Sequence, residues 1–304
     1  MAEKRRKSSA EATGGSHIGL RLLRLSEKLP LPVTRKIGAL LGLLFYAVNR
    51  KRRNIARTNI ALCFPELGER ARRRILIDSY KAYGQGIMDL SYLWWGSDEK
   101  FHRMLEFEGL EHVQPLLDEN APIIYVTSHK PGTDFGGVGI STLNPAISMM
   151  KPVKDPEINR LLIKGRTRFG GRMVMRDQGL RPVIQSMRRE KRAFYYIPDE
   201  DFGAEETVFA PFFGIQRATL PTLGRLAKIT RATVVPAFAH ITPTGYKVIF
   251  DKPLTQLPGP TAEDDAARLN AVVESDIRRA PDQYLWTLKW FKTRPEGERD
   301  FYRE

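Results

Sequence analysis

The strongest constraint on the fold is an alternation of short apolar, β-prone runs with segments of helical periodicity. Residues 121–127 read Ala-Pro-Ile-Ile-Tyr-Val-Thr, a run typical of a strand that is buried on both faces. Further strands are expected over residues 146–150, 172–175, 193–197, 233–239 and 246–250, and helices over residues 71–95, 131–142, 156–168, 180–189, 219–229 and 262–279. This order predicts an α/β sandwich, with a mixed, mostly buried sheet flanked by helices.

The excess of positive charge is an N-terminal property. The net charge is +14, and residues 1–80 hold 18 Lys and Arg against 6 Asp and Glu, whereas the remaining residues are close to neutral. Residues 1–16 combine a basic cluster with small and polar residues, so we expect a disordered tail there. No continuous apolar run follows these charges, which excludes a secretory signal.

Residues 17–66 combine apolar sequence with arginine clusters. The longest apolar run, residues 37–48, is followed by Arg-Lys-Arg-Arg, and it is shorter than the about 20 residues that cross a bilayer. The pattern favours a helical region on an anionic membrane leaflet, although a buried helix with solvated ends would look similar. Zinc-finger spacing and RNP-like aromatic patterns are missing, so we expect no nucleic-acid partner. Residues 67–304 would then form the domain that carries the chemistry.

His129 is the best candidate for a catalytic base. Among the five histidines, it alone directly follows a buried-strand pattern, and α/β folds bind ligands at the carboxyl ends of their strands. Asp134 could accept a hydrogen bond from one imidazole nitrogen and leave the other free as a general base. The spacing alone is weak evidence, and the strand-end context carries the argument. Lys130 could keep the imidazole neutral through like-charge repulsion.

No protein nucleophile accompanies this histidine in the sequence. There is no G-x-S-x-G motif, and Cys63, the only cysteine, lies in an apolar segment where packing is its expected role. A single cysteine also excludes an internal disulfide and suits a reducing compartment. We therefore expect the nucleophile to belong to the substrate, for instance a hydroxyl, and the group to be transferred directly.

Two further clusters are candidates for substrate binding. Arg172 follows Phe-Gly-Gly with Arg176 behind it, which suits phosphate or carboxylate recognition, although surface ion pairs use arginine equally often. Asp199 and Asp201 belong to a Pro-Asp-Glu-Asp segment after a predicted strand. This segment is either a charged turn or a site that orients basic side chains or sugar hydroxyls. No histidine is near in sequence, so we assign no metal site.

These features resemble the late acyltransferases of lipid A biosynthesis, the lauroyl/myristoyl acyltransferase family within the lysophospholipid acyltransferase superfamily. The resemblance covers nearly the whole chain, and its most specific parts are the N-terminal Arg/Asn/Phe-Pro-Glu run and the C-terminal Tyr-x-Trp run. The segments that carry it are residues 52–66, 129–134, 169–172, 196–203, 218–221, 234–236 and 283–294.

The resemblance implies an enzyme at the cytoplasmic face of the cell inner membrane. Such an enzyme takes a fatty acyl group from acyl carrier protein, as co-substrate and without a cofactor, and places it on a hydroxyl of a hydroxyacyl chain of a Kdo-bearing lipid A precursor. By this likeness, His129 would deprotonate the acceptor hydroxyl with Asp134 orienting it. Arg172 and Asp199 match positions that the family uses around its substrates. An acidic carrier protein and a phosphorylated lipid would both suit the basic N-terminal region.

Two alternatives stay open at this point. The chain could acylate another lipid or glycolipid, such as an ornithine lipid or a phosphatidylinositol mannoside. It could also be a non-catalytic binding protein, in which case loss of His129 would leave its function intact, whereas an enzyme would lose about 10²–10⁴-fold in rate.

Overall fold

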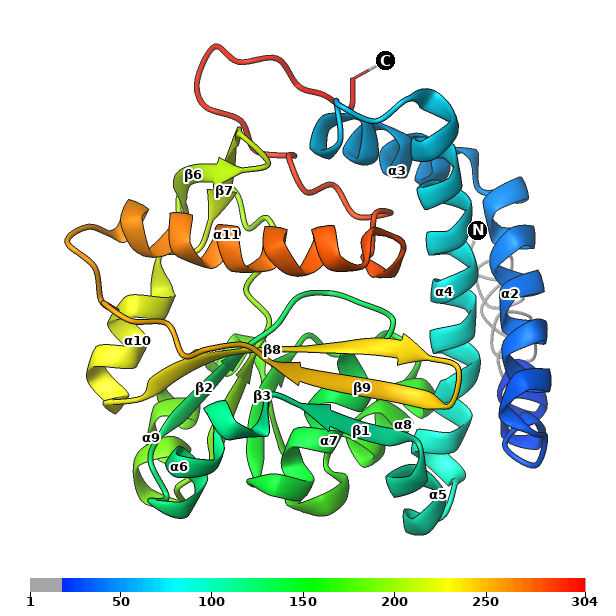
Figure 1. Ribbon diagram of the computed structural model, residues 1–304, viewed down its shortest axis with the longest axis horizontal. Coiled ribbons are helices and arrows are strands. Elements are labelled where there is room, and N and C mark those ends of the chain that lie inside the picture. The colour runs from blue at the N-terminus through cyan, green and yellow to red at the C-terminus, as the bar shows by residue number, and fades with distance from the viewer. Residues whose placement is uncertain (1–17, 304) are drawn as a thin grey trace, which may run out of the picture.

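A seven-stranded sheet forms the centre of the molecule (Figure 1). The structure is a computed structural model that describes residues 18–303, so the tail predicted for residues 1–16 lies outside the described residues. The strand order is β1-β9-β8-β2-β5-β3-β4, and neighbouring strands are parallel except β8 with β9. These strands are β1 (Leu105–Glu108), β2 (Ile123–Val126), β3 (Ala146–Met150), β4 (Arg172–Met175), β5 (Ala193–Tyr196), β8 (Thr233–Thr242) and β9 (Gly245–Phe250). The predicted fold class is confirmed.

Helices cover both faces of the sheet, which explains why its central strands are apolar throughout. Along β2, Ile124 and Val126 pack into one hydrophobic cluster, whereas Ile123 and Tyr125 pack into a second cluster on the opposite face. All four side chains are fully buried, as expected of a parallel strand between two helical layers. The helices beyond the N-terminal region are α5 (Asp98–Arg103), α6 (Gln114–Asp118), α7 (Thr133–Leu143), α8 (Pro156–Arg166), α9 (Arg181–Arg189), α10 (Thr222–Thr230) and α11 (Ala262–Arg279).

The structure differs from the sequence prediction at several element boundaries. Residues 219–229 were expected to be one helix, but Thr219 ends a strand and α10 begins only after Pro221. That strand, β7 (Ile215–Thr219), forms an antiparallel hairpin with β6 (Val208–Phe212), which the sequence analysis did not predict. Strand β1 was also missed, because its four residues alternate between charged and apolar side chains at a sheet edge, where one face is solvated.

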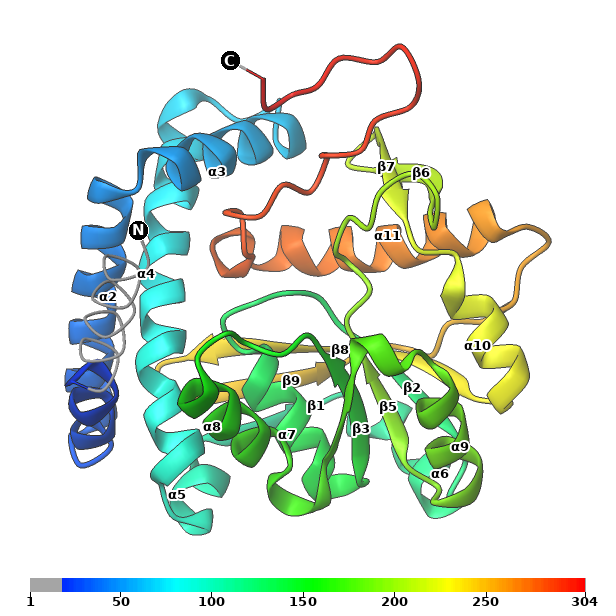
Figure 2. The same cartoon turned by 180° about the vertical axis from the view of Figure 1, so that it is seen from behind.

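Three N-terminal helices form a layer beside the sheet. Helix α4 (Glu69–Trp95) stands next to the sheet, α2 (Leu31–Val48) runs along α4 on its far side, and α3 (Arg50–Cys63) crosses at one end (Figures 1 and 2). Residues 18–26 are also helical. With 18 residues and a mean hydropathy of 1.4, α2 is longer than the apolar run predicted for residues 37–48, and it is long and apolar enough to cross a membrane by length and composition alone.

Glycines allow α2 and α4 to pack with their backbones in close approach. A Cβ atom added to Gly38 would lie 2.7 Å from the carbonyl oxygen of Gly84, and Gly42 abuts the carbonyl of Tyr80 in the same way. No side chain larger than hydrogen fits between helices at this separation. The glycines of α2 therefore set its distance from α4.

A buried ion pair joins α2 to both α4 and the sheet. Arg35 Nε on α2 donates to Asp89 Oδ2 on α4 at 2.9 Å, and Arg35 Nη2 donates to the carbonyl of Gly245 at the start of β9 at 2.8 Å. The Tyr246 hydroxyl donates to the same Asp89 oxygen at 2.8 Å. Because each charge has hydrogen-bonding partners, the pair is tolerated in the interior.

Replacing Gly84 tests the close helix packing. Alanine has a higher helix propensity than glycine by about 1 kcal/mol, so a simple helix would be stabilised. We expect Gly84→Ala instead to lower the free energy of unfolding by about 1–3 kcal/mol, because the added methyl group forces the helices apart. Gly19→Ala is the matched control, since no atom lies within 4 Å of its added Cβ. Denaturant unfolding of the detergent-solubilised protein measures both, and equal effects would contradict the packing argument.

Candidate active site

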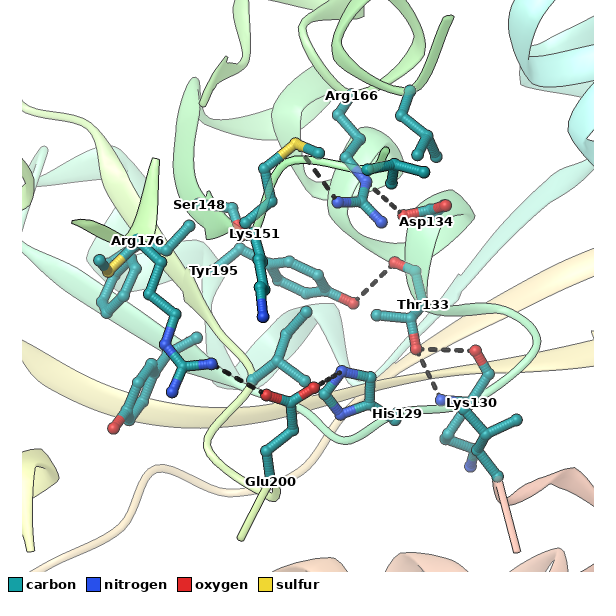
Figure 3. A pocket seen from close by; sticks show the side chains of 18 of the residues that line it. His129, Lys130, Thr133, Asp134, Ser148, Lys151, Arg166, Arg176, Tyr195 and Glu200 are labelled. Atoms are coloured by element: carbon teal, nitrogen blue, oxygen red, sulfur yellow. Dashed lines mark hydrogen bonds and ion pairs between the residues drawn. The ribbon is translucent and has the colours of Figure 1, made fainter. Parts of the chain in front are cut away.

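A pocket of about 660 Å³ opens at the carboxyl ends of β2, β3 and β5 (Figure 3). This is the edge at which α/β sheets bind their ligands. Apolar side chains form most of its wall, and polar groups gather at its base around His129. The apolar lining comes from α4, from β3 and the segment after it, from α8, and from the loops that follow β4, β5 and β7. It includes Ile87, Leu90, Met149, Met150, Val153, Leu162, Leu180, Phe202 and Leu220.

Asp199 holds His129 from two directions. The backbone N–H of His129 donates to Asp199 Oδ2 at 2.8 Å, and the ring nitrogen Nδ1 lies 2.5 Å from Asp199 Oδ1. Strands β2 and β5 are paired neighbours, so the residues that follow them meet at the same edge of the sheet. With its proton on Nδ1, the imidazole carries a lone pair on Nε2, which is the form that a general base requires.

The Asp199 carboxylate stays ionised although it is almost completely buried. Burial by itself would raise its pKa, but the charge and hydrogen bonds of His129, together with the charge of Arg217, hold the pKa of Asp199 below its usual value. The Tyr284 hydroxyl also donates to Oδ2 at 3.2 Å, and Arg217 donates to the backbone carbonyl of Asp199. Its acceptor atoms are thus supplied with donors.

The second ring nitrogen of His129 is on the pocket side. Nε2 lies 3.8 Å from Glu200 Oε1, and Glu200 pairs with Arg176 at 3.2 Å across the pocket (Figure 3). Burial alone would lower the pKa of His129, but the carboxylate of Asp199, assisted by Glu200, raises that pKa above its ordinary value. The arrangement therefore produces a stronger base than free imidazole, with its lone pair facing the cavity.

Asp134 is not the hydrogen-bond partner of His129 in this structure, contrary to the sequence prediction. Both residues line the pocket, but Asp134 Oδ1 accepts from Arg166 Nε at 2.7 Å. Asp134 lies in the first turn of α7, and Arg166 reaches it from the end of α8. The predicted geometry is wrong because Asp199, which is distant in sequence, occupies the Nδ1 side of the ring.

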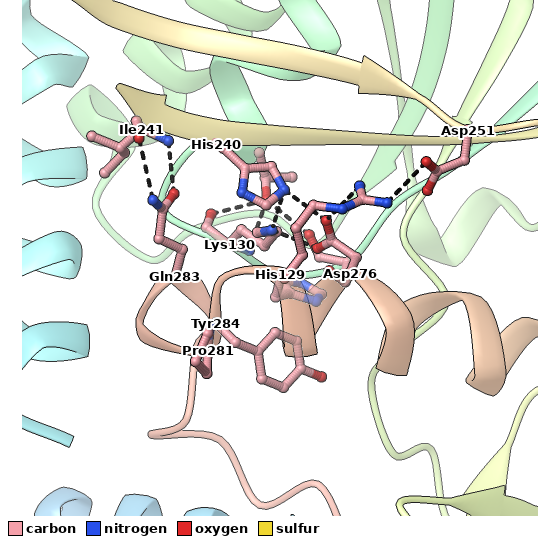
Figure 4. A network of polar contacts seen from close by, with 12 residues as sticks. His129, Lys130, His240, Ile241, Asp251, Asp276, Pro281, Gln283 and Tyr284 are labelled. Atoms are coloured by element: carbon pink, nitrogen blue, oxygen red, sulfur yellow. Dashed lines mark hydrogen bonds and ion pairs between the residues drawn. The ribbon is translucent and has the colours of Figure 1, made fainter. Parts of the chain in front are cut away.

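Lys130 is also placed differently from the prediction. Its ammonium group lies within the protein, 2.5 Å from Asp276 Oδ2, and His240 Nε2 contacts Asp276 Oδ1 at 2.6 Å (Figure 4). Burial lowers the pKa of Lys130, and the Asp276 charge opposes that effect. Since the pKa of His129 is raised and Lys130 is neutralised by its own partner, like-charge repulsion from Lys130 does not set the state of the base.

Of the remaining predicted substrate-binding residues, Arg176 lines the pocket, whereas Arg172 and Asp201 lie outside its lining. Arg176 lines the pocket and stacks on Phe202, with its guanidinium carbon 3.8 Å from the ring centroid. Arg172 instead pairs with Glu190 and lines a small adjoining cavity. Asp201 accepts hydrogen bonds from the backbone and hydroxyl of Thr293, both at 2.7 Å, and so anchors the C-terminal segment. Substrate contact by Arg172, Arg176 and Asp201 stays a prediction.

Several residues of the site were not singled out from the sequence. Glu200 belongs to the acidic segment that was noticed there, so its position after the strand was an available signal. Arg166, Lys151 and Tyr195 line the pocket but gave no comparable signal, because nothing local distinguishes an arginine at a helix end from a solvated one. Ile87 of α4 is another lining residue that only the tertiary fold brings to the pocket.

Cys63 is packed in the interior, as its apolar sequence context predicts. Its thiol is buried, and that burial raises its pKa, so the thiolate is not accessible. Thr133 and Ser148 line the pocket, but the hydroxyl of Thr133 is engaged by the carbonyls of Ser128 and Lys130. Among residues 18–303, no group of three or more His, Cys, Asp or Glu side chains is arranged to hold a metal ion.

Comparisons with known proteins cover almost the entire chain. The family model for bacterial lipid A biosynthesis acyltransferases matches residues 1–293. A lipid A biosynthesis acyltransferase of Haemophilus influenzae is 33% identical over 290 residues, covering 95% of this chain and 90% of that protein. The lipid A biosynthesis lauroyltransferase of Escherichia coli is 32% identical, covering 92% of each chain. The corresponding myristoyltransferase is 31% identical, covering 90% of this chain and 84% of its own.

Lys130→Met tests the buried ion pair behind the base. Removing Lys130 leaves the buried Asp276 carboxylate with His240 and the more distant Arg279 as its partners, so we expect a loss of about 3 kcal/mol in the free energy of unfolding. Lys247→Met is the matched control, since Lys247 pairs with Glu108 at 3.0 Å on the exposed side of β9, and such a surface pair contributes at most about 1 kcal/mol. If chemical denaturation gave equal losses for both variants, the buried ion pair of Lys130 would contribute no more to stability than the exposed pair of Lys247.

Proposed function

The chain belongs to the bacterial lipid A biosynthesis acyltransferase family, and from this membership we propose a specific reaction. The enzyme, an acyltransferase, moves a fatty acyl group from acyl carrier protein to the hydroxyl of a hydroxyacyl chain on a Kdo-bearing lipid A precursor. The observation that carries the proposal is the pairing of His129 with buried Asp199, which leaves Nε2 directed to an apolar pocket. The same membership confirms the resemblance inferred from the sequence.

The proposed chemistry is a direct transfer with His129 as general base. Nε2 takes the proton of the acceptor hydroxyl while the hydroxyl oxygen attacks the thioester carbonyl carbon of the donor. The tetrahedral intermediate then collapses, the carbon–sulfur bond breaks, and the thiol of the carrier protein leaves with the proton held by His129. Asp199 stabilises the imidazolium that exists between these steps, because its carboxylate lies 2.5 Å from Nδ1. No covalent acyl-enzyme is required.

The pocket suits the chemistry of the two substrates. A pocket of about 660 Å³ with a mainly apolar wall can bury a fatty acyl chain. This volume lies within the usual range of small-molecule sites. Lys151 and Arg176 add positive charge to the pocket wall. These side chains can bind the phosphate or carboxylate groups of an acceptor lipid. The guanidinium group of arginine matches the geometry of such oxyanions.

The N-terminal helices support a location at the inner membrane. The outer side of α2 exposes Leu40, Leu44 and Val48, each more than half accessible, and the basic start of α3 follows directly. Because α4 covers the other side of α2 along its length, we place α2 in the plane of an anionic leaflet rather than across the bilayer. A donor carried by acyl carrier protein puts this leaflet on the cytoplasmic side.

Removal of the base tests the reaction itself. We expect His129→Ala to lower the transfer rate about 10²–10⁴-fold, because the proposed reaction passes the hydroxyl proton to Nε2 of this side chain. Ser148→Ala removes a hydroxyl that lines the same pocket, and it should retain activity, since a direct transfer needs no serine nucleophile. Mass spectrometry of a tetraacylated Kdo-bearing precursor, incubated with a mixture of acyl carrier protein thioesters, measures the added chain. Transfer only to an ornithine lipid or another acceptor would overturn the proposed substrate.

The pH dependence of the rate distinguishes Asp199 from Asp134 as the partner of the base. His129 must be unprotonated to act, so activity falls as the pH drops through its raised pKa. Replacing Asp199 by Asn removes the negative charge that raises this pKa, and the acidic limb of kcat/KM should move to lower pH while the maximal rate also falls. Asp134→Asn should move that limb less. The opposite order of the two shifts would show that Asp134 controls the base.

A further inference from the structure

The exposed large apolar side chains are concentrated in two places on the described part of the chain. Ten of them lie between Ile18 and Val48, on the N-terminal helices. Of the other three, Ile87 and Val153 are each 40% accessible, and both line the mouth of the active-site pocket. The third, Ile229, lies alone on α10. Single exposed apolar residues are ordinary, but a cluster beside a ligand pocket marks an interaction surface.

The α4 wall of the pocket lies close to α2. Gly84 of α4 abuts Gly38 of α2, and Ile87 lies one turn further along α4. Tyr83 connects the two regions, since it lines the pocket and its ring lies 6.1 Å from that of Phe45 on α2. Helix α4 therefore carries both the contact with α2 and one wall of the pocket.

The opposite side of the mouth combines apolar and basic residues. Val153 belongs to the segment between β3 and α8, and Lys151 and Lys154 are exposed on either side of it. An apolar side chain between lysines is typical of protein segments at the boundary between lipid chains and anionic headgroups. This segment faces α4 across the mouth, because Val153, Ile87 and Leu90 all line the same pocket.

We propose that the mouth of the pocket is itself immersed in the anionic leaflet that receives α2. Ile87 and Val153 enter the lipid chain region together with the outer face of α2, and Lys151 and Lys154 lie at the level of the headgroups. The acceptor lipid then enters sideways between α4 and the segment 151–154, and its acyl chains stay in an apolar medium throughout. This inference rests on the membrane association in the proposed function and adds which part of the catalytic domain meets the lipid.

Site-specific fluorescence in the full-length protein tests this placement. Cys63 is buried, so a thiol-reactive environment-sensitive dye labels an engineered surface cysteine selectively. Four variants are labelled separately: Ile87→Cys and Val153→Cys at the mouth, Leu41→Cys on α2 as the membrane reference, and Ile229→Cys as the control. Vesicles of phosphatidylethanolamine and phosphatidylglycerol carry a quencher attached to the lipid acyl chain.

We expect vesicles to blue-shift and quench the dye at positions 87 and 153 to the same extent as at position 41, with no change at position 229. If position 41 is quenched while positions 87 and 153 behave like position 229, the pocket opens to water and this inference is wrong, although membrane association stands. If position 41 also stays unquenched, the membrane association in the proposed function fails, and the lateral entry fails with it.

Discussion

The site depends on the hydrogen bonds between the buried carboxylate of Asp199 and His129. Asp199 follows β5, and its carboxylate receives hydrogen bonds from the backbone and ring of His129 after β2 and from the hydroxyl of Tyr284 in the C-terminal segment. Arg217 on β7 binds the carbonyl of the same residue. Asp199 therefore joins four segments of the chain, its own and those of His129 and Tyr284 through its carboxylate, and that of Arg217 through its backbone carbonyl. An ionised carboxylate at this depth is stable only with such a set of donors, so the fold around it and the protonation state of the base are coupled.

Behind the base, a second buried network fixes the loop that carries it. Lys130 contacts Asp276 on α11 and His240 on β8, while the carbonyl of His129 accepts a hydrogen bond from the backbone of Leu285. Trp290 lies beside the imidazole, with ring centroids 6.2 Å apart. The loop between β2 and α7 is thus held by charge on one side and by aromatic packing on the other, which keeps Nε2 directed to the pocket without help from a substrate.

The sequence was sufficient for the fold class and for placing His129 at the pocket, and insufficient for the hydrogen-bond partner of its ring. Strands such as β2 and β5 are continuous apolar runs because both faces are buried, and this pattern is visible without a structure. His129 could be found from its place after such a run. Its partner could not, because the pairing of β2 with β5 is a tertiary event, and Asp134, close in sequence, is a plausible alternative that Arg166 removes. The hairpin of β6 and β7 was missed for a related reason, because both strands are held by tertiary contacts: Asn270 on α11 donates hydrogen bonds to Ala210 on β6 and Thr219 on β7.

Direct observation of the imidazole tests the account most closely. With histidine labelled by ¹⁵N, NMR spectra of the solubilised protein report the tautomer and the titration of each ring, and His129→Ala identifies its signals. The account predicts that neutral His129 carries its proton on Nδ1, that its pKa lies above that of an ordinary histidine, and that Asp199→Asn lowers this pKa. A proton on Nε2 in the neutral form, or a pKa that does not respond to the loss of the Asp199 charge, would contradict the central claim.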